Sequence, residues 1–192
     1  ARRLEELRSG VRVFEFDLPP LVLFKKSRLW EKEGALPGHV SYIGADLAQN
    51  SLEDFERRLR KVGYAPSRRT AFVLEGIITH IGERGAENLL RLIASFSGEG
   101  SSMSMTYVHL NEQGVPLLDP TQTPAVRDCQ RNEIKADRIE EFLEKRGFTQ
   151  LCSLTIDQVR ERYCPERDRL KMVYSIVTAR VKGALFGASQ GG

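Results

Sequence analysis

VRVFEFDL, at Val11–Leu18, is an apolar run that ends in two carboxylates, Glu15 and Asp17. Its β-branched and aromatic residues, with Gly10 before it and a proline pair after it, predict a buried strand. Ligands of open parallel sheets bind at the carboxyl ends of the strands, where an acidic side chain can accept hydrogen bonds from a ribose diol. The stretch therefore predicts one strand of an α/β sheet, with a binding site at its end.

Two later strand-like stretches also end in an acidic residue. HVSYIGADL leads to Asp46, and TAFVLEG leads to Glu75 and Gly76. Glu75 follows four apolar residues, so we expect it to be buried and to need a partner or a ligand that offsets its desolvation. Three strands with acidic ends are the basis of the functional prediction.

Strands and amphipathic helices alternate along the chain. The first strand is followed by a helix over 19–33, which Pro19 and Pro20 can start and Gly34 can end. Further strands are expected at 39–44, 70–74 and 102–108, with helices from Ser51 to Gly63 and over 82–94. This alternation predicts a parallel α/β sheet with right-handed crossovers.

The remaining segments complete one expected domain, residues 1–185, followed by a flexible tail at 186–192. Residues 2–8 fit the last turns of a helix, and 111–132 form a long loop without periodicity, typical of lids or binding segments. Asp137 is expected to cap a helix, and Thr155 to open another between strands at 148–154 and 171–181. Those last two strands predict a mixed, partly antiparallel edge of the sheet.

Composition excludes several classes of protein. The 192 residues are 41% hydrophobic and 29% charged, as in a globular protein, and the net charge of +3 is spread along helical faces, which does not favour nucleic acid binding. No apolar stretch is long enough to span a bilayer. The three cysteines (Cys129, Cys152 and Cys164) lack metal-ligand spacing, which predicts no metal site and a reducing, cytoplasmic location.

Each candidate residue also has an ordinary structural interpretation. Glu15 and Asp17 can stabilise the start of the following helix, and Asp46 can close an Asx turn. His80 and His109 are more often packing or surface residues than catalytic ones. Tyr107, at the end of the strand 102–108, either lines a substrate pocket or packs within the sheet.

Five stretches, in this order and spacing, resemble the leucine carboxyl methyltransferase family and its bacterial relatives, which are class I S-adenosylmethionine-dependent O-methyltransferases. They are VRVFEFDLP with the following Lys25, YIGADL, GYAPSRRTAFVLEGIITHI, LLRLIASFSGEGSSMSMTYV and RGFTQL. The resemblance implies a doubly wound, Rossmann-like sheet that binds S-adenosylmethionine and a protein or small-molecule acceptor. The methyl group would be transferred to a carboxylate or a hydroxyl of that acceptor.

The resemblance also implies roles for individual residues. Glu15 and Asp17 would hold the cofactor ribose, Asp46 and Leu47 would contact the adenine, and Glu75 with Gly76 would lie beside the methionine end. A carboxylate acceptor needs no base, whereas a hydroxyl acceptor makes His80 or His109 worth testing. His80 stands where relatives usually have tyrosine, which leaves the acceptor open.

Family members carry a glycine-rich turn and a central strand just before the position of Ala1, and neither is present in this sequence. Two interpretations are open: the 192 residues are the later part of a longer protein, or the protein does not bind the cofactor alone. A noncatalytic scaffold that acts in protein binding is the alternative function. A third hypothesis, an α/β enzyme on another nucleotide, predicts affinity for a dinucleotide.

Overall fold

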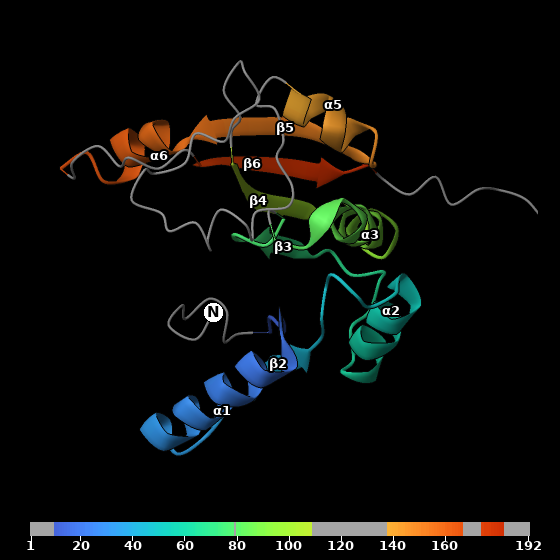
Figure 1. Ribbon diagram of the computed structural model, residues 1–192, viewed down its shortest axis with the longest axis vertical. Helices are drawn as coiled ribbons and strands as arrows, with labels where there is room; N and C mark the ends of the chain where they lie inside the picture. The colour runs from blue at the N-terminus through green and yellow to red at the C-terminus, as the bar shows by residue number, and fades with distance from the viewer. Residues whose placement is uncertain (1–9, 79, 109–137, 167–173, 183–192) are drawn as a thin grey trace, which may run out of the picture. The chain divides into compact units, whose positions relative to one another are not determined.

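The computed structural model describes residues 10–78, 80–108, 138–166 and 174–182 (Figure 1). The chain divides into two compact units, Ala1–Ala65 and Pro66–Gly192. Unit 1 contains β1 (Val13–Asp17), α1 (Pro19–Glu33), β2 (Val40–Gly44) and α2 (Leu52–Lys61). Unit 2 contains β3 (Ala71–Leu74), α3 (Gly82–Ser95), β4 (Ser102–Val108), α5 (Ile139–Glu144), β5 (Phe148–Thr155), α6 (Ile156–Tyr163) and β6 (Tyr174–Val181).

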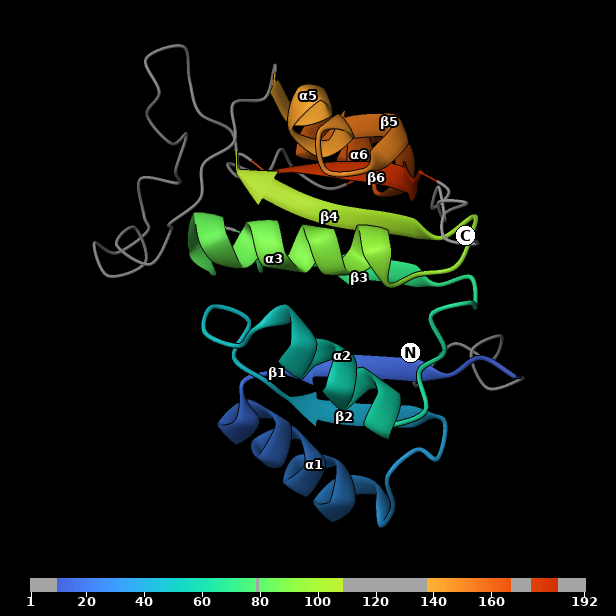
Figure 2. The ribbon, with the colours of Figure 1, turned by 90° about the vertical axis from the view of Figure 1, so that its right-hand side faces the viewer.

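Unit 1 is built around a parallel pair of strands that lies between two helices (Figures 1 and 2). Phe14 and Phe16 of β1 make edge-to-face contacts with Tyr64 and Phe55, with ring centroids 5.4 and 6.1 Å apart. Phe55, on α2, is only 1% exposed. Side chains at alternate positions of a strand point to one face. The phenylalanines of β1 therefore pack toward α2, and the acidic side chains between them project to the other face.

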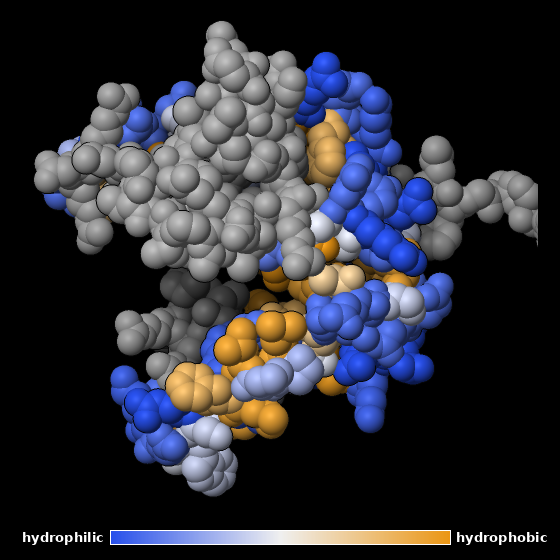
Figure 3. Space-filling view, viewed as in Figure 1, coloured by the Kyte–Doolittle hydropathy of each residue, from blue (hydrophilic) through white to orange (hydrophobic). Residues whose placement is uncertain are grey.

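Helix α1 has the bounds that the sequence predicts. Pro19 and Pro20 occupy its first turn, and it ends at Gly34, whose φ of +70° and N–H bond to the Trp30 carbonyl (2.8 Å) make a left-handed cap. Val22 is its one buried residue. Several apolar side chains of this helix are exposed, namely Leu21, Leu23, Phe24 and Trp30. Figure 3 shows hydrophobic surface on the visible face of unit 1.

Unit 2 is a mixed four-stranded sheet in the order β3-β4-β6-β5. Strands β3 and β4 are parallel, whereas β6 runs antiparallel to both β4 and β5. This confirms the prediction of a mixed, partly antiparallel edge. The apolar stripe of α3 supplies much of the core, with Ala86, Leu89, Leu90 and Ile93 all buried. The capping box at Thr155 and Gln158 opens α6.

The α/β fold class is confirmed, but the described strands form two sheets instead of one. Among them, β1 pairs only with β2, and β3 pairs only with β4 along its own length. The resemblance places a further strand at the middle of the sheet, and no described residue supplies it.

Some predictions fall on residues outside the described ranges. They are the helix at 2–8, the long loop at 111–132, the cap at Asp137 and the tail at 186–192. The single domain at 1–185 also stays a prediction. Within the described part of the chain, no helix is both long enough and apolar enough to cross a membrane.

Candidate cofactor site

The carboxyl ends of β1 and β2 meet at one edge of unit 1. Asp17, the last residue of β1, pairs in register with Gly44, the last residue of β2. The Ala45 N–H donates to the Asp17 carbonyl at 2.9 Å, which extends the pairing by one residue. Asp46 follows directly. Two acidic residues that are 29 positions apart in the sequence are therefore brought to the same strand ends, as the sequence predicts for a site of this kind.

Glu15 is held by a lysine from the helix that follows its strand. The Lys25 Nζ lies 2.5 Å from Glu15 Oε2 and 6.0 Å from the centroid of the Tyr42 ring. Tyr42 is the residue that pairs with Glu15 across the strands. The other oxygen, Glu15 Oε1, has no hydrogen bond with any described residue. The ion pair therefore fixes one carboxylate oxygen and leaves the second available as an acceptor.

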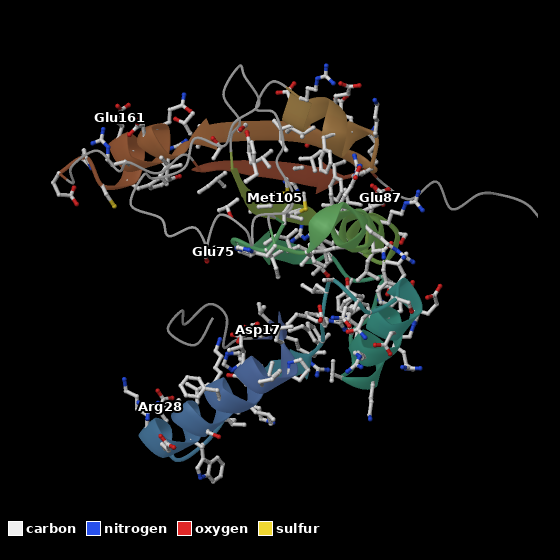
Figure 4. The ribbon with its side chains drawn as sticks, in the orientation of Figure 1. Asp17, Arg28, Glu75, Glu87, Met105 and Glu161 are labelled. Atoms are coloured by element: carbon white, nitrogen blue, oxygen red, sulfur yellow. The ribbon has the colours of Figure 1, made fainter. Side chains whose placement is uncertain are left out.

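Asp17 bonds the backbone of the residue before α1 and keeps one oxygen available. Its Oδ1 accepts a hydrogen bond from the Leu18 N–H at 2.8 Å, and its Oδ2 makes none within the described residues. The side chain is exposed, and Figure 4 shows it beside the first turn of α1. The bond goes to the N–H of Leu18, the residue before α1, and no side chain caps this helix, so the contacts of Asp17 do not support its helix-start interpretation.

Asp46 forms the Asx turn that its structural interpretation predicts. Its Oδ1 accepts from the Ala48 N–H at 2.9 Å, and its carbonyl accepts from the Asn50 N–H at 2.9 Å. Its Oδ2 has no hydrogen bond with the described residues. Leu47, the residue expected against an adenine ring, is 8% exposed. The turn therefore fixes the direction of the Asp46 carboxylate without using both oxygens.

Three side chains that sequence reasoning did not assign to the site surround this turn. Asn50 Oδ1 accepts from the Asp46 N–H at 2.8 Å, and Asn50 Nδ2 donates to Asp54 Oδ2 at 2.9 Å. Arg58 donates from Nε to Asp54 Oδ2 at 2.7 Å and from Nη1 to the Gly44 carbonyl at 2.9 Å. The hydrogen bond from Arg58 lowers the pKa of Asp54 from its usual value of 3.8. The only sequence signal is the spacing of Asn50, Asp54 and Arg58, each four residues apart.

Glu75 is exposed, so the expectation that it is buried is wrong. The reason is that β3 is an edge strand of its sheet with one poorly covered face: Val73 is 75% exposed and Ala71 is also exposed. The Glu75 carboxylate makes no hydrogen bond or ion pair with the described residues, and Figure 4 shows it at the end of β3. A ligand role for Glu75 therefore depends on its position and not on desolvation.

Because Gly76 has no side chain, another group can approach the backbone beside Glu75. Its φ of +66° favours glycine, and a Cβ placed there would meet no heavy atom within 4 Å. Its N–H donates to Thr106 Oγ1 of β4 at 2.7 Å. The turn after β3 is thus fixed by β4 and remains open on the side of the missing side chain.

The candidates for acceptor chemistry are not brought together by the described structure. Tyr107 is 2% exposed and shares a hydrogen bond of 2.9 Å with Ser153 Oγ, as its packing interpretation predicts. His80 is exposed, and its backbone N–H donates to the Ile77 carbonyl at 3.0 Å. His109 lies outside the described residues. No group of three or more metal-ligating side chains occurs among the described residues.

Comparison with known proteins shows which family this part of the chain resembles. Residues 1–94, which include all of the predicted cofactor residues, match the model of the leucine carboxyl methyltransferase family. This part of the chain is similar to that family. A relative from Mycolicibacterium gilvum, provisionally named an S-adenosyl-L-methionine-dependent methyltransferase, is 30% identical over 127 residues, which are 66% of this chain and 36% of the relative. The chain spans about a third of the length of the curated relatives it matches.

Solved structures of low sequence identity share the fold of this chain. An O-methyltransferase family protein from Burkholderia thailandensis has a TM-score of 0.58 and 15% identity, covering 93% of this chain and 46% of that one. The (4+2)-cyclase SpnF has a TM-score of 0.57 and 14% identity, covering 93% of this chain and 71% of that one. At these identities the likeness shows the fold alone, and the two titles name different reactions.

Proposed function

We propose that this protein is an S-adenosylmethionine-dependent O-methyltransferase that transfers a methyl group to a carboxylate or hydroxyl of a protein or small molecule. The observation that carries the proposal is the meeting of Asp17 and Asp46 at the carboxyl ends of the parallel β1–β2 pair. Each has one carboxylate oxygen without a hydrogen bond to a described residue. The family of residues 1–94 supports the same cofactor.

The described residues fit S-adenosylmethionine in their donor and acceptor chemistry. Glu15 Oε1 and Asp17 Oδ2 are acceptors that suit the two hydroxyls of a ribose, and Asp46 Oδ2 suits the exocyclic amine of adenine. In unit 2, the Glu75 carboxylate is an acceptor whose chemistry suits an amino group such as that of methionine, and a Cβ placed at Gly76 would meet no heavy atom within 4 Å.

When bound, the cofactor supplies a sulfonium methyl group: an acceptor oxygen bonds to the methyl carbon while the carbon–sulfur bond breaks and its electron pair remains on sulfur. The protein's part is to hold both reactants in line and exclude water. A carboxylate acceptor is already ionised, so no residue needs to take a proton. A hydroxyl acceptor must lose one, and His80 is the candidate base within the described residues.

Two further properties belong to the proposal. A reducing, cytoplasmic location is favoured by cysteines that remain free in the described part of the chain, Cys152 and Cys164. The absence of a basic cluster from the sequence favours an acceptor other than nucleic acid. No described contact specifically favours a noncatalytic scaffold.

The test is isothermal titration of S-adenosylhomocysteine, the demethylated product, into the folded chain, with NAD titrated in parallel. Asp46→Asn removes one charged acceptor, so we expect binding to weaken about 10- to 100-fold, the equivalent of about 1.5–3 kcal/mol for a charged hydrogen bond. Glu140→Gln, an exposed carboxylate on α5, is the matched control and should leave affinity unchanged. A folded chain that binds NAD and not S-adenosylhomocysteine, or that binds neither, would overturn the proposal.

A further inference from the structure

We propose that Asn50, Asp54 and Arg58 act as positioning residues that aim the Asp46 carboxylate, and that they thereby determine selectivity for adenine over other purines. The inference rests on the proposed function, because it assumes that Asp46 receives the base of an adenosine cofactor. It concerns a set of side chains that touch neither the ribose acceptors nor the turn at Gly76.

Asn50 closes the Asp46 turn through both its backbone and its side chain. Its N–H donates to the Asp46 carbonyl at 2.9 Å, and its Oδ1 accepts from the Asp46 N–H at 2.8 Å. The amide has only one orientation that suits its two neighbours. Asp54 is an acceptor, so the NH₂ group must face it, and the carbonyl oxygen must then face the Asp46 N–H.

Arg58 anchors this arrangement to the strand that carries Asp46. Its guanidinium bonds Asp54 at 2.7 Å and the carbonyl of Gly44, the last residue of β2, at 2.9 Å. The Asp54 side chain is 15% exposed. Its lowered pKa, caused first by the bond from Arg58, keeps it ionised and therefore an acceptor for Asn50. The end of β2 is thus fixed by Arg58 of α2, and the turn after it is fixed by Asn50, whose side chain is held by Asp54 of α2.

The fixed turn makes the Asp46 carboxylate selective. Oδ1 is held by the Ala48 N–H at 2.9 Å, so Oδ2 is the oxygen that can meet a base edge. An adenine amine donates to that oxygen. Hypoxanthine carries a carbonyl at the same position, so two acceptors would face each other and the desolvated carboxylate would lack a partner. This discrimination depends on the direction of Oδ2, which the contacts of Asn50 and Arg58 maintain.

A purely structural role for the three residues gives a different expectation. Asp54 also lies in the first turn of α2, where its N–H donates to the Ser51 hydroxyl, and it pairs with the exposed Arg57. If the contacts only stabilise α2, their loss will lower stability, and the affinities for the two bases will fall together. A change in the ratio of the two affinities is the signature of positioning.

The experiment measures affinities for S-adenosylhomocysteine and S-inosylhomocysteine in the full chain and in four variants. We expect the wild-type chain to prefer the adenine compound, and Asn50→Ala and Arg58→Ala to reduce that preference about 3- to 10-fold, as expected for loss of an orienting hydrogen bond. Arg58→Lys keeps the positive charge but cannot bond both Asp54 and the Gly44 carbonyl, so it should reduce the preference for the adenine compound less than Arg58→Ala does. Arg57→Ala, whose guanidinium also pairs with Asp54 but does not reach Gly44, is the matched control and should not change it.

The outcomes separate this inference from the proposed function. A wild-type chain that binds neither compound overturns both. A wild-type chain that binds S-adenosylhomocysteine, with the same preference in all folded variants, overturns the positioning role alone. Thermal unfolding of each variant shows whether it folds, and Arg58→Lys decides the question if the alanine variants do not.

Discussion

An acidic residue follows both β2 and β3, yet the two carboxylates differ in their hydrogen bonds. Asp46 lies in a closed turn whose surrounding side chains are hydrogen-bonded to one another and to the strand. The Glu75 carboxylate has no hydrogen bond or ion pair with any described residue, and the neighbouring Gly76 N–H donates a hydrogen bond to Thr106 of β4. The Asp46 carboxylate is therefore oriented by hydrogen bonds before any ligand binds, whereas the Glu75 carboxylate is not. Preorganisation reduces the entropy lost on binding, so a ligand group that binds Asp46 should lose less entropy than one that binds Glu75.

The largest effect is expected from a substitution that removes a buried side chain from the core of unit 1. Phe55→Ala empties a site that is 1% exposed and in contact with Phe16, so we expect it to lower the free energy of unfolding by about 3–5 kcal/mol. Amide hydrogen exchange of β1 and α2 follows the opening of unit 1. The exchange protection of these two elements should fall markedly in Phe55→Ala.

A matched change in unit 2 is the control for that experiment. Leu90→Ala removes a fully buried side chain of α3 and should cost about 2–5 kcal/mol, detected by circular dichroism. If Leu90→Ala lowers the exchange protection of β1 and α2 as much as Phe55→Ala does, the two units open together.

A smaller effect is expected at Glu75, where binding and stability should separate. Glu75→Gln breaks no described contact, so the free energy of unfolding should stay within about 0.5 kcal/mol of wild type, as for ordinary surface substitutions. Its affinity for S-adenosylhomocysteine should fall about 10-fold, because a charged partner of the amino group is lost. Calorimetric titration and urea unfolding of the same preparation measure both quantities.

Glu83→Gln is the control for Glu75, since it neutralises an exposed acid in the first turn of α3. It should change the affinity for S-adenosylhomocysteine by no more than about two- to threefold and the free energy of unfolding by no more than about 0.5 kcal/mol. Unchanged affinity in Glu75→Gln would mean that the acid at the end of β3 plays no part in binding.

The sequence predicts well those features that depend on neighbouring residues. Pro19 with Pro20 and Gly34 give both ends of α1, and the strand 102–108 matches β4. The acid at the end of each strand is also a local feature, and register then brings Asp17 and Asp46 together.

What the sequence does not predict depends on contacts between distant segments. The exposure of Glu75 follows from β3 lying at the edge of its sheet, which no residue of TAFVLEG encodes. The bond from Arg58 to the Gly44 carbonyl joins residues 14 positions apart, so helical spacing could suggest the Asp54–Arg58 pair but not its anchor on β2.

The smallest expected effect concerns acid pH and again compares the two units. The folded-state pKa of Asp54 is lowered, first by the Arg58 bond, and that of Glu141 on α5 is lowered, first by Lys145. A carboxylate whose pKa is lower in the folded state than in the unfolded state stabilises the fold at pH values above the unfolded-state pKa. This stabilisation is lost as the pH falls through the folded-state pKa. The stability difference between wild type and Asp54→Asn should therefore be present at pH 6 and should shrink below about pH 4.

Urea midpoints at pH 6 and pH 3 measure this difference, and Glu141→Gln is the counterpart in unit 2. Its ion pair joins two largely exposed side chains one helical turn apart, so water and salt screen it more than they screen Asp54, which is 15% exposed. The pH-dependent loss should accordingly be larger for Asp54→Asn than for Glu141→Gln. A difference for Asp54→Asn that stays constant from pH 6 to pH 3 would mean that the charge of Asp54 does not stabilise its hydrogen bonds with Asn50 and Arg58.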